Sequence, residues 1–277
     1  MKKDSLSLKD YFKTQKAFQL KWKESWQCYE TFPKPDVKEI SKYYDSKNYI
    51  SHQKEAKIFK DKVYNWVRNH MLNTKTKWIK NEVGTSVNLL DFGCGVGEFV
   101  KRANQKGLIA EGIEPNYEAR QIGIQNKQNI FADLSDINNK RFDVVTLWHV
   151  LEHLHEPDLF LKEIRNYLNK KGKLIIAVPN FESQDAKYYN QYWAAYDVPR
   201  HLYHFSKKSI SILAEQNGFK INKTYPLKFD SYYVSMLSEK YKTGKIGFQW
   251  IWNGFLSNCK ARKNKEWSSL VFVLDLV

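Results

Sequence analysis

From residue 87 onward, short apolar runs alternate with segments whose apolar residues recur at helical spacing. The apolar runs predict strands at residues 87–92, 109–113, 129–132, 142–148, 173–178, 219–225 and 268–276. The intervening amphipathic segments predict helices at residues 97–106, 116–127 and 157–170. Such alternation is typical of βαβ crossovers. We therefore predict an α/β fold, doubly wound, whose parallel sheet is covered by helices on both faces.

The chain before residue 87 has a different pattern. Residues 1–50 are rich in aromatic residues and lysine and contain Pro33 and Pro35, which predicts short helices or irregular structure. Residues 51–80 carry apolar residues near helical spacing, and Gly84 follows them. We expect residues 1–85 to form a helical N-terminal cap and residues 86–277 to form the main domain. Two aromatic-rich insertions, at about 180–205 and 229–265, interrupt that domain.

A glycine-rich turn follows the first predicted strand of the main domain. The segment Asp91-Phe92-Gly93-Cys94-Gly95-Val96-Gly97 places three glycines between this strand and a helix. Glycine allows a tight turn and a close approach of a ligand to the backbone. Glu114 ends the next strand, 23 residues after Asp91, where a carboxylate can accept hydrogen bonds from both ribose hydroxyls. The pattern predicts a site for an adenosine-containing cofactor.

The spacing of the glycines distinguishes between two kinds of adenosine-containing cofactor, a dinucleotide such as NAD and a sulfonium compound. A dinucleotide site has the pattern GxGxxG, with a pyrophosphate at the helix N-terminus. Here the pattern is GxGxG, and Glu98 stands where the last glycine of the dinucleotide pattern would be. A carboxylate in the first helical turn opposes a pyrophosphate but not a cationic sulfonium, and Asp91 favours the same choice. The residues therefore favour a sulfonium cofactor over NAD.

On these motifs the chain resembles the class I S-adenosylmethionine-dependent methyltransferases, from about residue 51 to the C-terminus. Residues 91–97 resemble the first motif of that family, residues 143–154 the fourth-strand motif and residues 174–180 the fifth. The resemblance implies a Rossmann-like sheet of seven strands whose last strand, at residues 268–276, is antiparallel. Within this family, the chain resembles a branch whose substrates are undefined, and it is similar to the ubiquinone-biosynthesis O-methyltransferases.

The resemblance also implies which residues bind S-adenosylmethionine. Glu114 matches the acid that holds the ribose, and Asp133 and Leu134 match the segment beside the adenine. The expected cofactor-binding residues are Asp91, Gly93, Gly95, Gly97, Glu114, Asp133, Leu134 and Trp148. Asp133 can equally be a surface or helix-capping residue. Cys94 has no base beside it in the sequence, so we do not expect a nucleophilic role.

Three polar residues follow the strand that ends at Trp148. His149, Glu152 and His153 are spaced i, i+3 and i+4, so one helical turn would present them on one face. Two imidazoles and a carboxylate can bind a divalent metal, or one histidine can accept a proton from the methyl acceptor. Both interpretations are open. The catalytic candidates are His149 and His201, which follows the aromatic residues Tyr192, Trp193 and Tyr196. These aromatics can wall an acceptor pocket or fill the core.

The HxxEH pattern is similar to one that holds a metal in plant small-RNA 2′-O-methyltransferases and some ubiquinone-biosynthesis enzymes. His149 replaces the first acid of their pattern, which favours a softer metal than magnesium. His204 is a candidate for completing the ligand set. The competing interpretation is that His153 and His204 make structural hydrogen bonds. We favour it, so a divalent metal is a possible but not the expected cofactor.

Composition and charge add limits on partners. The 277 residues carry a net charge of +15, but only seven of the 45 basic residues are arginines, and the lysines are scattered along the chain. Nucleic-acid sites cluster their charge and favour arginine, so a nucleic-acid partner is less favoured. The three cysteines form no CxxC pair, which argues against disulfides or a zinc ribbon. No apolar run is long enough to span a bilayer and no signal peptide is evident, so we expect a cytoplasmic protein.

The sequence thus predicts an S-adenosylmethionine-dependent methyltransferase. The expected acceptor is a small molecule, a lipid-linked compound or a glycan, methylated at oxygen or nitrogen. Two alternatives are an RNA methyltransferase, motivated by the HxxEH pattern and the basic charge, and a catalytically silent S-adenosylmethionine-binding module. Residues 245–256, with their aromatics among lysines, suit a lid, a dimer face or an interfacial helix, although packing over the sheet edge is favoured. The sequence does not determine the oligomeric state.

Overall fold

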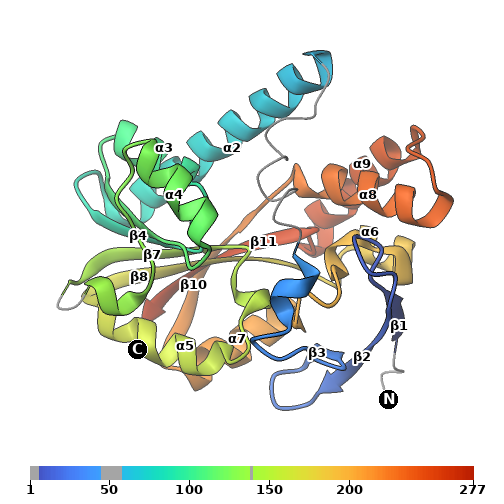
Figure 1. Ribbon diagram of the computed structural model, residues 1–277, viewed down its shortest axis with the longest axis horizontal. Coiled ribbons are helices and arrows are strands. Elements are labelled where there is room, and N and C mark those ends of the chain that lie inside the picture. Colours follow the sequence, from blue (N-terminus) through green and yellow to red (C-terminus); the bar gives the residue numbers. More distant parts are fainter. Residues whose placement is uncertain (1–5, 45–57, 138–139) are drawn as a thin grey trace. The chain divides into compact units, whose positions relative to one another are not determined.

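The computed structural model describes residues 6–44, 58–137 and 140–277 (Figure 1). The chain divides into two compact units. The first unit comprises Met1–Asp45, Leu151–Asp158 and Ala177–Phe272, and the second comprises Ser46–Val150, Leu159–Ile176 and Val273–Val277.

A seven-stranded sheet contains the strands predicted from the apolar runs. Its order is β10-β11-β8-β7-β4-β5-β6, and the last strand, β11, is antiparallel. The strands are β4 (Asn88–Phe92), β5 (Ile109–Ile113), β6 (Ile130–Phe131), β7 (Phe142–Trp148), β8 (Leu168–Pro179), β10 (Phe219–Pro226) and β11 (Ser269–Leu276). The predicted α/β fold class is therefore confirmed.

The second unit is built on the parallel strands of this sheet. β4 pairs with β5 and β7, and Asp91 lies opposite Gly112 on one side and Thr146 on the other. Leu89, Leu90, Val144 and Val145 are fully buried, as expected for strands covered on both faces. The helices of this unit are α2 (Ile58–Val83), α3 (Glu98–Gln105) and α4 (Tyr117–Gln125), and α5 (Pro157–Ile164) connects β7 to β8. The helix predicted over residues 51–80 is confirmed from Ile58; residues 51–57 lie outside the described residues.

The first unit contains an antiparallel sheet that the sequence did not predict. β1 (Leu6–Lys9), β2 (Ala17–Lys23), β3 (Cys28–Phe32) and β9 (Tyr203–His204) pair in that order. The expectation of short helices or irregular structure is therefore wrong for residues 6–32. β2 does alternate exposed and buried residues, as a strand with one buried face should. The sheet is completed by β9, about 170 residues later in the chain, which no local pattern reveals.

The two units do not follow the boundary expected at residues 85 and 86. The N-terminal strands belong with residues 177–272, whereas α2 belongs with the parallel strands. The physical reason is the core beneath β1 and β2, where Leu8, Phe18 and Leu20 pack with Trp193 and Tyr196. An N-terminal segment that buries its apolar face against a distant insertion cannot form a separate cap.

The two aromatic-rich insertions fold into short helices. α6 (Gln184–Tyr189) belongs to the first, and α8 (Asp230–Thr243) and α9 (Gln249–Asn264) form the second, while α7 (Lys207–Gln216) lies between them. The buried carboxylate of Asp185 joins these segments, because it accepts hydrogen bonds from Trp193 Nε1, Ser257 Oγ and Ser268 Oγ at 2.7–2.8 Å. Among the described residues, no helix combines the length and the hydropathy needed to cross a membrane.

Candidate functional site

The glycine-rich turn lies between β4 and α3 in the second unit, as predicted. Gly95 has a φ of +57°, a left-handed conformation that a side chain disfavours. No heavy atom lies within 4 Å of the position that a Cβ would take there. At Gly93 a Cβ would instead come within 2.6 Å of Val150 Cγ2. Gly95 is therefore required by backbone conformation and leaves open space beside the turn, whereas Gly93 is also required by packing.

Glu114 holds the turn from the end of β5. Its carboxylate oxygens accept hydrogen bonds from the backbone N–H groups of Gly95 and Asn116, both at 2.8 Å. Burial raises the pKa of Glu114, and the two N–H groups act in the opposite direction. A carboxylate oxygen has further acceptor capacity beyond one N–H. Glu114 therefore fixes the turn and can accept a ribose hydroxyl.

Asp91 lies at the end of β4 beside Glu114 and is buried. It accepts a hydrogen bond from Thr146 Oγ1 at 2.7 Å. Burial raises the pKa of Asp91 to about 7; the hydrogen bond from Thr146 and the charge of Lys75 lower it, while the charge of Glu114 raises it further. Two buried carboxyl groups in one place create a strongly acidic environment, which suits a cationic ligand.

The indole of Trp148 has ring contacts within the protein, but its N–H group is unpaired in the part of the chain that the structure describes. Its ring meets Phe99 edge-on at 5.3 Å, and Lys75 Nζ lies 4.2 Å from the ring centroid. Its Nε1–H is buried and has no hydrogen-bond partner among the described residues. A buried donor without a partner is rare in native proteins because it costs free energy. This unpaired donor and the open space at Gly95 are two features that a bound polar molecule could use, and a cofactor-binding role for Trp148 stays a prediction.

Asp133 and Leu134 are the other two residues that we expected to bind the cofactor, and both make local contacts within the protein. Asp133 is exposed, and its Oδ1 accepts a hydrogen bond from the Ser135 N–H at 2.9 Å, as in a local turn. Leu134 is buried, and its carbonyl accepts a hydrogen bond from Tyr167 Oη. The surface or capping role weighed for Asp133 therefore has a direct observation in its favour, and an adenine role for either residue stays a prediction.

Sequence reasoning missed two residues of this region. Thr146 binds Asp91 directly, and Lys75 of α2 lies over Trp148. Glu98, in the first turn of α3, pairs with Arg68 of α2 at 2.8 Å. Thr146 had a usable signal, because it is a polar residue among the apolar residues 144–148 of its strand. Nothing local in α2 indicates which of its cations reach the glycine-rich turn.

In this protein a glycine-rich turn follows one parallel strand, and an acidic residue follows the next. This arrangement is typical of α/β proteins that bind an adenosine-containing cofactor. Residues 41–224 match the family described as "Methyltransferase domain", so the chain belongs to that family. It is a class I S-adenosylmethionine-dependent methyltransferase.

Individual relatives are distant. The chain is 24% identical over 180 residues to the ubiquinone biosynthesis O-methyltransferase of Pelagibacter ubique, covering 57% of this chain and 73% of that protein. It is 33% identical over 104 residues to an uncharacterized methyltransferase of Alkaliphilus oremlandii, covering 35% of this chain and 48% of the relative. The matched region thus spans about half the length of the second relative.

Two solved structures share the fold. The magnesium protoporphyrin IX methyltransferase of Synechocystis PCC 6803, solved with bound SAH, aligns with a TM-score of 0.58 and 13% identity over 87% of this chain and 100% of that chain. The 1,6-didemethyltoxoflavin-N1-methyltransferase of Burkholderia thailandensis aligns with a TM-score of 0.54 and 13% identity over 96% and 98% of the two chains. At such low identity the likeness concerns the fold.

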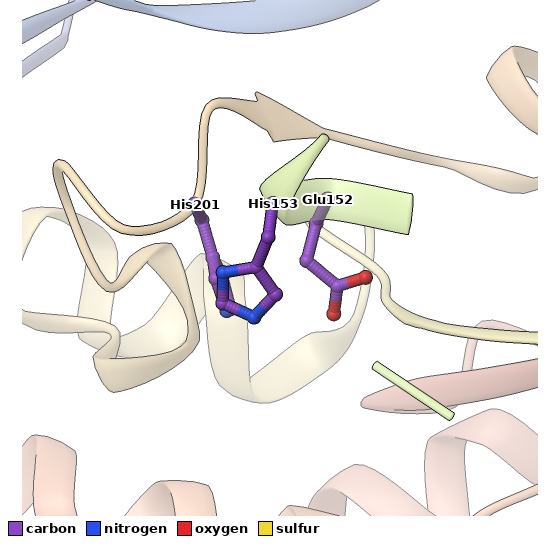
Figure 2. Close-up of side chains that lie close together, drawn as sticks. All are labelled: Glu152, His153 and His201. Atoms are coloured by element: carbon purple, nitrogen blue, oxygen red, sulfur yellow. The ribbon is translucent and has the colours of Figure 1, made fainter. Parts of the chain in front are cut away.

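The first unit brings together Glu152, His153 and His201 (Figure 2), whose potential ligand atoms all lie within 4.8 Å of one another. His153 Nδ1 lies 2.9 Å from the Arg200 carbonyl, and His201 Nδ1 lies 2.8 Å from the Ala195 carbonyl. Both imidazoles must therefore donate from Nδ1, which leaves Nε2 as the acceptor or ligand atom. One carboxylate and two imidazoles are a donor set that zinc accepts.

The expected arrangement around His149 is wrong in one respect. His149 has a φ of +57° and precedes the short 3-10 turn Leu151–His153, so His149, Glu152 and His153 do not share one continuous helical turn. His204 does not complete the cluster either, because its Nε2 lies 2.9 Å from Thr31 Oγ1. His201 takes that place. The structural hydrogen bonds favoured for His153 and His204 are present.

Burial controls the charge of the two downstream histidines. Desolvation, followed by the charge of His153, lowers the pKa of His201 to about 4. Desolvation also lowers the pKa of His204 well below its usual value. His201 is therefore neutral at physiological pH with a lone pair on Nε2. Burial raises the pKa of the Cys94 thiol, which agrees with the absence of a nucleophilic role expected for it.

The first unit also contains an open hollow of about 410 Å³. Aromatic rings dominate its lining, with one cation and one amide: Leu6, Tyr29, Phe181, Ala186, Lys187, Asn190 and Tyr196. Its size is in the range of small-molecule sites. Trp193 and Tyr196 are buried in the core of this unit, so the core-filling role is observed, whereas a role of these aromatics in walling an acceptor pocket stays a prediction.

Proposed function

We propose that this methyltransferase transfers a methyl group to oxygen or nitrogen of a small-molecule, lipid-linked or glycan acceptor by in-line displacement. The observation that carries the proposal is the buried Trp148 Nε1–H, which has no hydrogen-bond partner in the part of the chain that the structure describes and belongs to the same unit as the turn held by Glu114. The aromatic hollow of the first unit supports a small-molecule acceptor. The relatives include both O- and N-methyltransferases, which supports oxygen or nitrogen as the acceptor atom.

In this proposal the second unit holds the cofactor. S-adenosylmethionine supplies an electrophilic methyl group on a cationic sulfonium. Glu114 accepts the ribose hydroxyls, the turn through Gly93, Gly95 and Gly97 admits the cofactor close to the backbone, and Asp91 provides negative charge. Trp148 donates its indole N–H and shields the site from water. Asp133 and Leu134 are assigned to the adenine end on the resemblance alone.

The proton of the acceptor requires a base, for which we propose His149 and His201. His201 is neutral, and its Nδ1–H is fixed on the Ala195 carbonyl, so that Nε2 can accept a proton. Its pKa of about 4 makes it a weak base, suited to passing a proton onward rather than keeping it. His149 is held in a left-handed conformation, which is uncommon for a non-glycine residue and often found at functional sites.

Calorimetric titration of the full chain with S-adenosylmethionine tests the cofactor site. We expect Trp148→Phe to keep the ring contacts but to weaken binding about tenfold, since one hydrogen bond is lost. Glu114→Gln is expected to weaken binding by at least that factor. Glu111→Gln, on the same strand but paired with Lys140, is the matched control and should bind like the native chain. Absence of binding by the native chain, or equal binding by all variants, would contradict the proposal.

Transfer of a labelled methyl group to a panel of phenols and amines tests turnover. His149→Ala and His201→Ala should lower kcat while leaving S-adenosylmethionine affinity within about twofold, because a general base contributes roughly 10²–10⁴-fold. His155→Ala, which removes a side chain bonded to the Pro35 carbonyl, is the matched control. A native chain that binds the cofactor but methylates no acceptor would instead identify a silent binding module.

A further inference from the structure

Helix α9 has an inverted distribution of side chains. Its buried residues are small or polar: Asn253, Gly254, Ser257 and Ala261. They are fixed by hydrogen bonds of Asn253 to Tyr189 Oη at 2.8 Å and of Ser257 to Asp185 at 2.7 Å. At Gly254 a Cβ would come within 2.7 Å of the Tyr232 ring, so the helix is closely packed on this side. Polar and small residues thus attach α9 to the first unit.

Four large apolar residues, in α9 or directly before it, lie on the other side, whereas Trp250 and Leu256 are half-buried. Phe248, Ile251, Trp252 and Phe255 follow the i, i+3, i+4, i+7 spacing of one helix face, and all four are exposed. Phe248 is 88% exposed and Trp252 56%. The rings of Trp252 and Phe255 stack at 5.6 Å, which makes the stripe continuous. A helix that presents its aromatic residues to solvent indicates an interaction surface.

The segment that carries this stripe contains charged residues of one sign only. Between residues 240 and 265 the sequence contains seven lysines and arginines and no aspartate or glutamate. All seven are exposed: Lys240, Lys242, Lys245, Lys260, Arg262, Lys263 and Lys265. Arg262 follows Phe255 by seven residues, so it continues the same helix face. Elsewhere the chain mixes acidic and basic residues, as its 30 acidic residues require.

We propose that the face formed by Phe248, Ile251, Trp252 and Phe255, with the surrounding lysines and arginines, docks on the surface of a membrane that contains anionic phospholipid. Aromatic residues on one face and basic residues beside them are the pattern of helices that lie in the lipid interface. Seven cations without an anion match a layer of phosphate-bearing headgroups better than a protein surface of mixed charge. Docking places no residue across the membrane.

Co-sedimentation of the full chain with vesicles tests the proposal. We expect binding to vesicles of phosphatidylcholine mixed with phosphatidylglycerol and little binding to phosphatidylcholine alone. Phe248→Ser with Trp252→Ser should lower the partition coefficient by at least about tenfold, since apolar area no longer enters the interface. Arg262→Glu with Lys263→Glu should lower it by at least about twentyfold, because each cation near an anionic surface contributes about a fivefold change.

Two matched controls distinguish an effect of this face from a general effect of exposed apolar residues or of net charge on vesicle binding. Trp66→Ser removes a tryptophan of similar exposure, 60%, on α2. Lys170→Glu with Lys171→Glu reverses an adjacent exposed basic pair on β8 and changes the net charge equally. Both should bind the vesicles like the native chain. Circular dichroism and S-adenosylmethionine titration of every variant establish that it is folded.

Three results would overturn the proposal. Equal binding to neutral and anionic vesicles, or no binding to either, would exclude an anionic membrane as the partner. Equal losses in the control variants would show that total charge or apolarity, and not this face, is responsible. A dimer in sedimentation velocity that Phe248→Ser with Trp252→Ser disperses, in a chain that does not bind vesicles, would assign the face to a second copy.

Discussion

At the scale of single residues, two features of the proposed cofactor site are an open space beside the backbone and a buried hydrogen-bond donor that has no partner in the described part of the chain. Gly95 faces open space, and Trp148 Nε1–H lacks a partner among the described residues. The sequence indicated Gly95 and Glu114 through their spacing. It did not indicate Lys75, because the role of this residue arises from its contact with Trp148 of β7 in the folded chain. Thr146 was detectable only as a polar residue in an apolar run, and its hydrogen bond to Asp91 depends on the pairing of β7 with β4.

The open space at Gly95 leads to a prediction with an internal control. Gly95→Ala and Gly107→Ala each place a side chain at positive φ, +57° and +82°, and neither Cβ would meet an atom within 4 Å. Each substitution should therefore lower the free energy of unfolding by about 1–2 kcal/mol. Only Gly95→Ala should also abolish S-adenosylmethionine binding in calorimetry. Equal binding by both variants would show that the open space is not used.

Asp91 makes a prediction about pH. Burial raises its pKa to about 7 in the folded protein, from an ordinary value of 3.8. Between these values the folded protein keeps a proton that the unfolded chain has released, so the contribution of Asp91 to stability falls as pH rises from about 4 to about 7. Asp91→Asn should remove this fall, measured as the difference in urea midpoint between variant and native chain across that range. Asp136→Asn, which changes an exposed carboxylate, should retain it.

At the scale of elements, the sequence predicted β4, β5, β7 and β11 nearly to the residue, because strands that are buried within the sheet are rich in apolar residues, whether they are parallel, as β4, β5 and β7 are, or antiparallel, as β11 is. It missed β1, β2 and β3, whose alternation is short, and it also missed β9, the two-residue strand that pairs with β3. Local patterns predict elements with strong periodicity, whereas pairing between distant segments depends on contacts that a pattern does not contain. The cluster of His153 with His201 was missed for the same reason, since residue 201 is adjacent to it only in the folded chain.

The β3–β9 pair provides a prediction at this scale. Thr31 Oγ1 donates to the His201 carbonyl at 2.6 Å and lies 2.9 Å from His204 Nε2. Thr31→Val keeps the shape but leaves two buried polar groups without this partner, so the free energy of unfolding should fall by about 1–3 kcal/mol. Thr243→Val, whose hydroxyl is exposed at the end of α8, should change it by less than about 0.5 kcal/mol. Chemical denaturation of the three chains gives the comparison, and equal stability of the two variants would contradict it.

At the scale of the whole molecule, the net charge of +15 has two components with different consequences. Most lysines are scattered, which gives a weak, evenly spread field that salt screens. The seven cations of residues 240–265 are concentrated on one segment, where they can act together on a charged surface. Total charge alone would suggest a nucleic-acid partner, whereas its distribution along the chain separates one basic segment from a scattered background.

This difference predicts two salt dependences in one protein. The affinity for S-adenosylmethionine should change less than about threefold between about 0.05 and 0.2 M salt, because the site relies on buried groups and hydrogen bonds that salt screens poorly. Binding to anionic vesicles should fall by more than about tenfold over the same range, as expected when several exposed cations contact phosphates. Both are measured on the native chain, with Arg262→Glu and Lys263→Glu flattening only the second dependence. A steep salt dependence of cofactor binding would show that scattered surface charge, and not the buried carboxyl groups of Asp91 and Glu114, attracts the ligand.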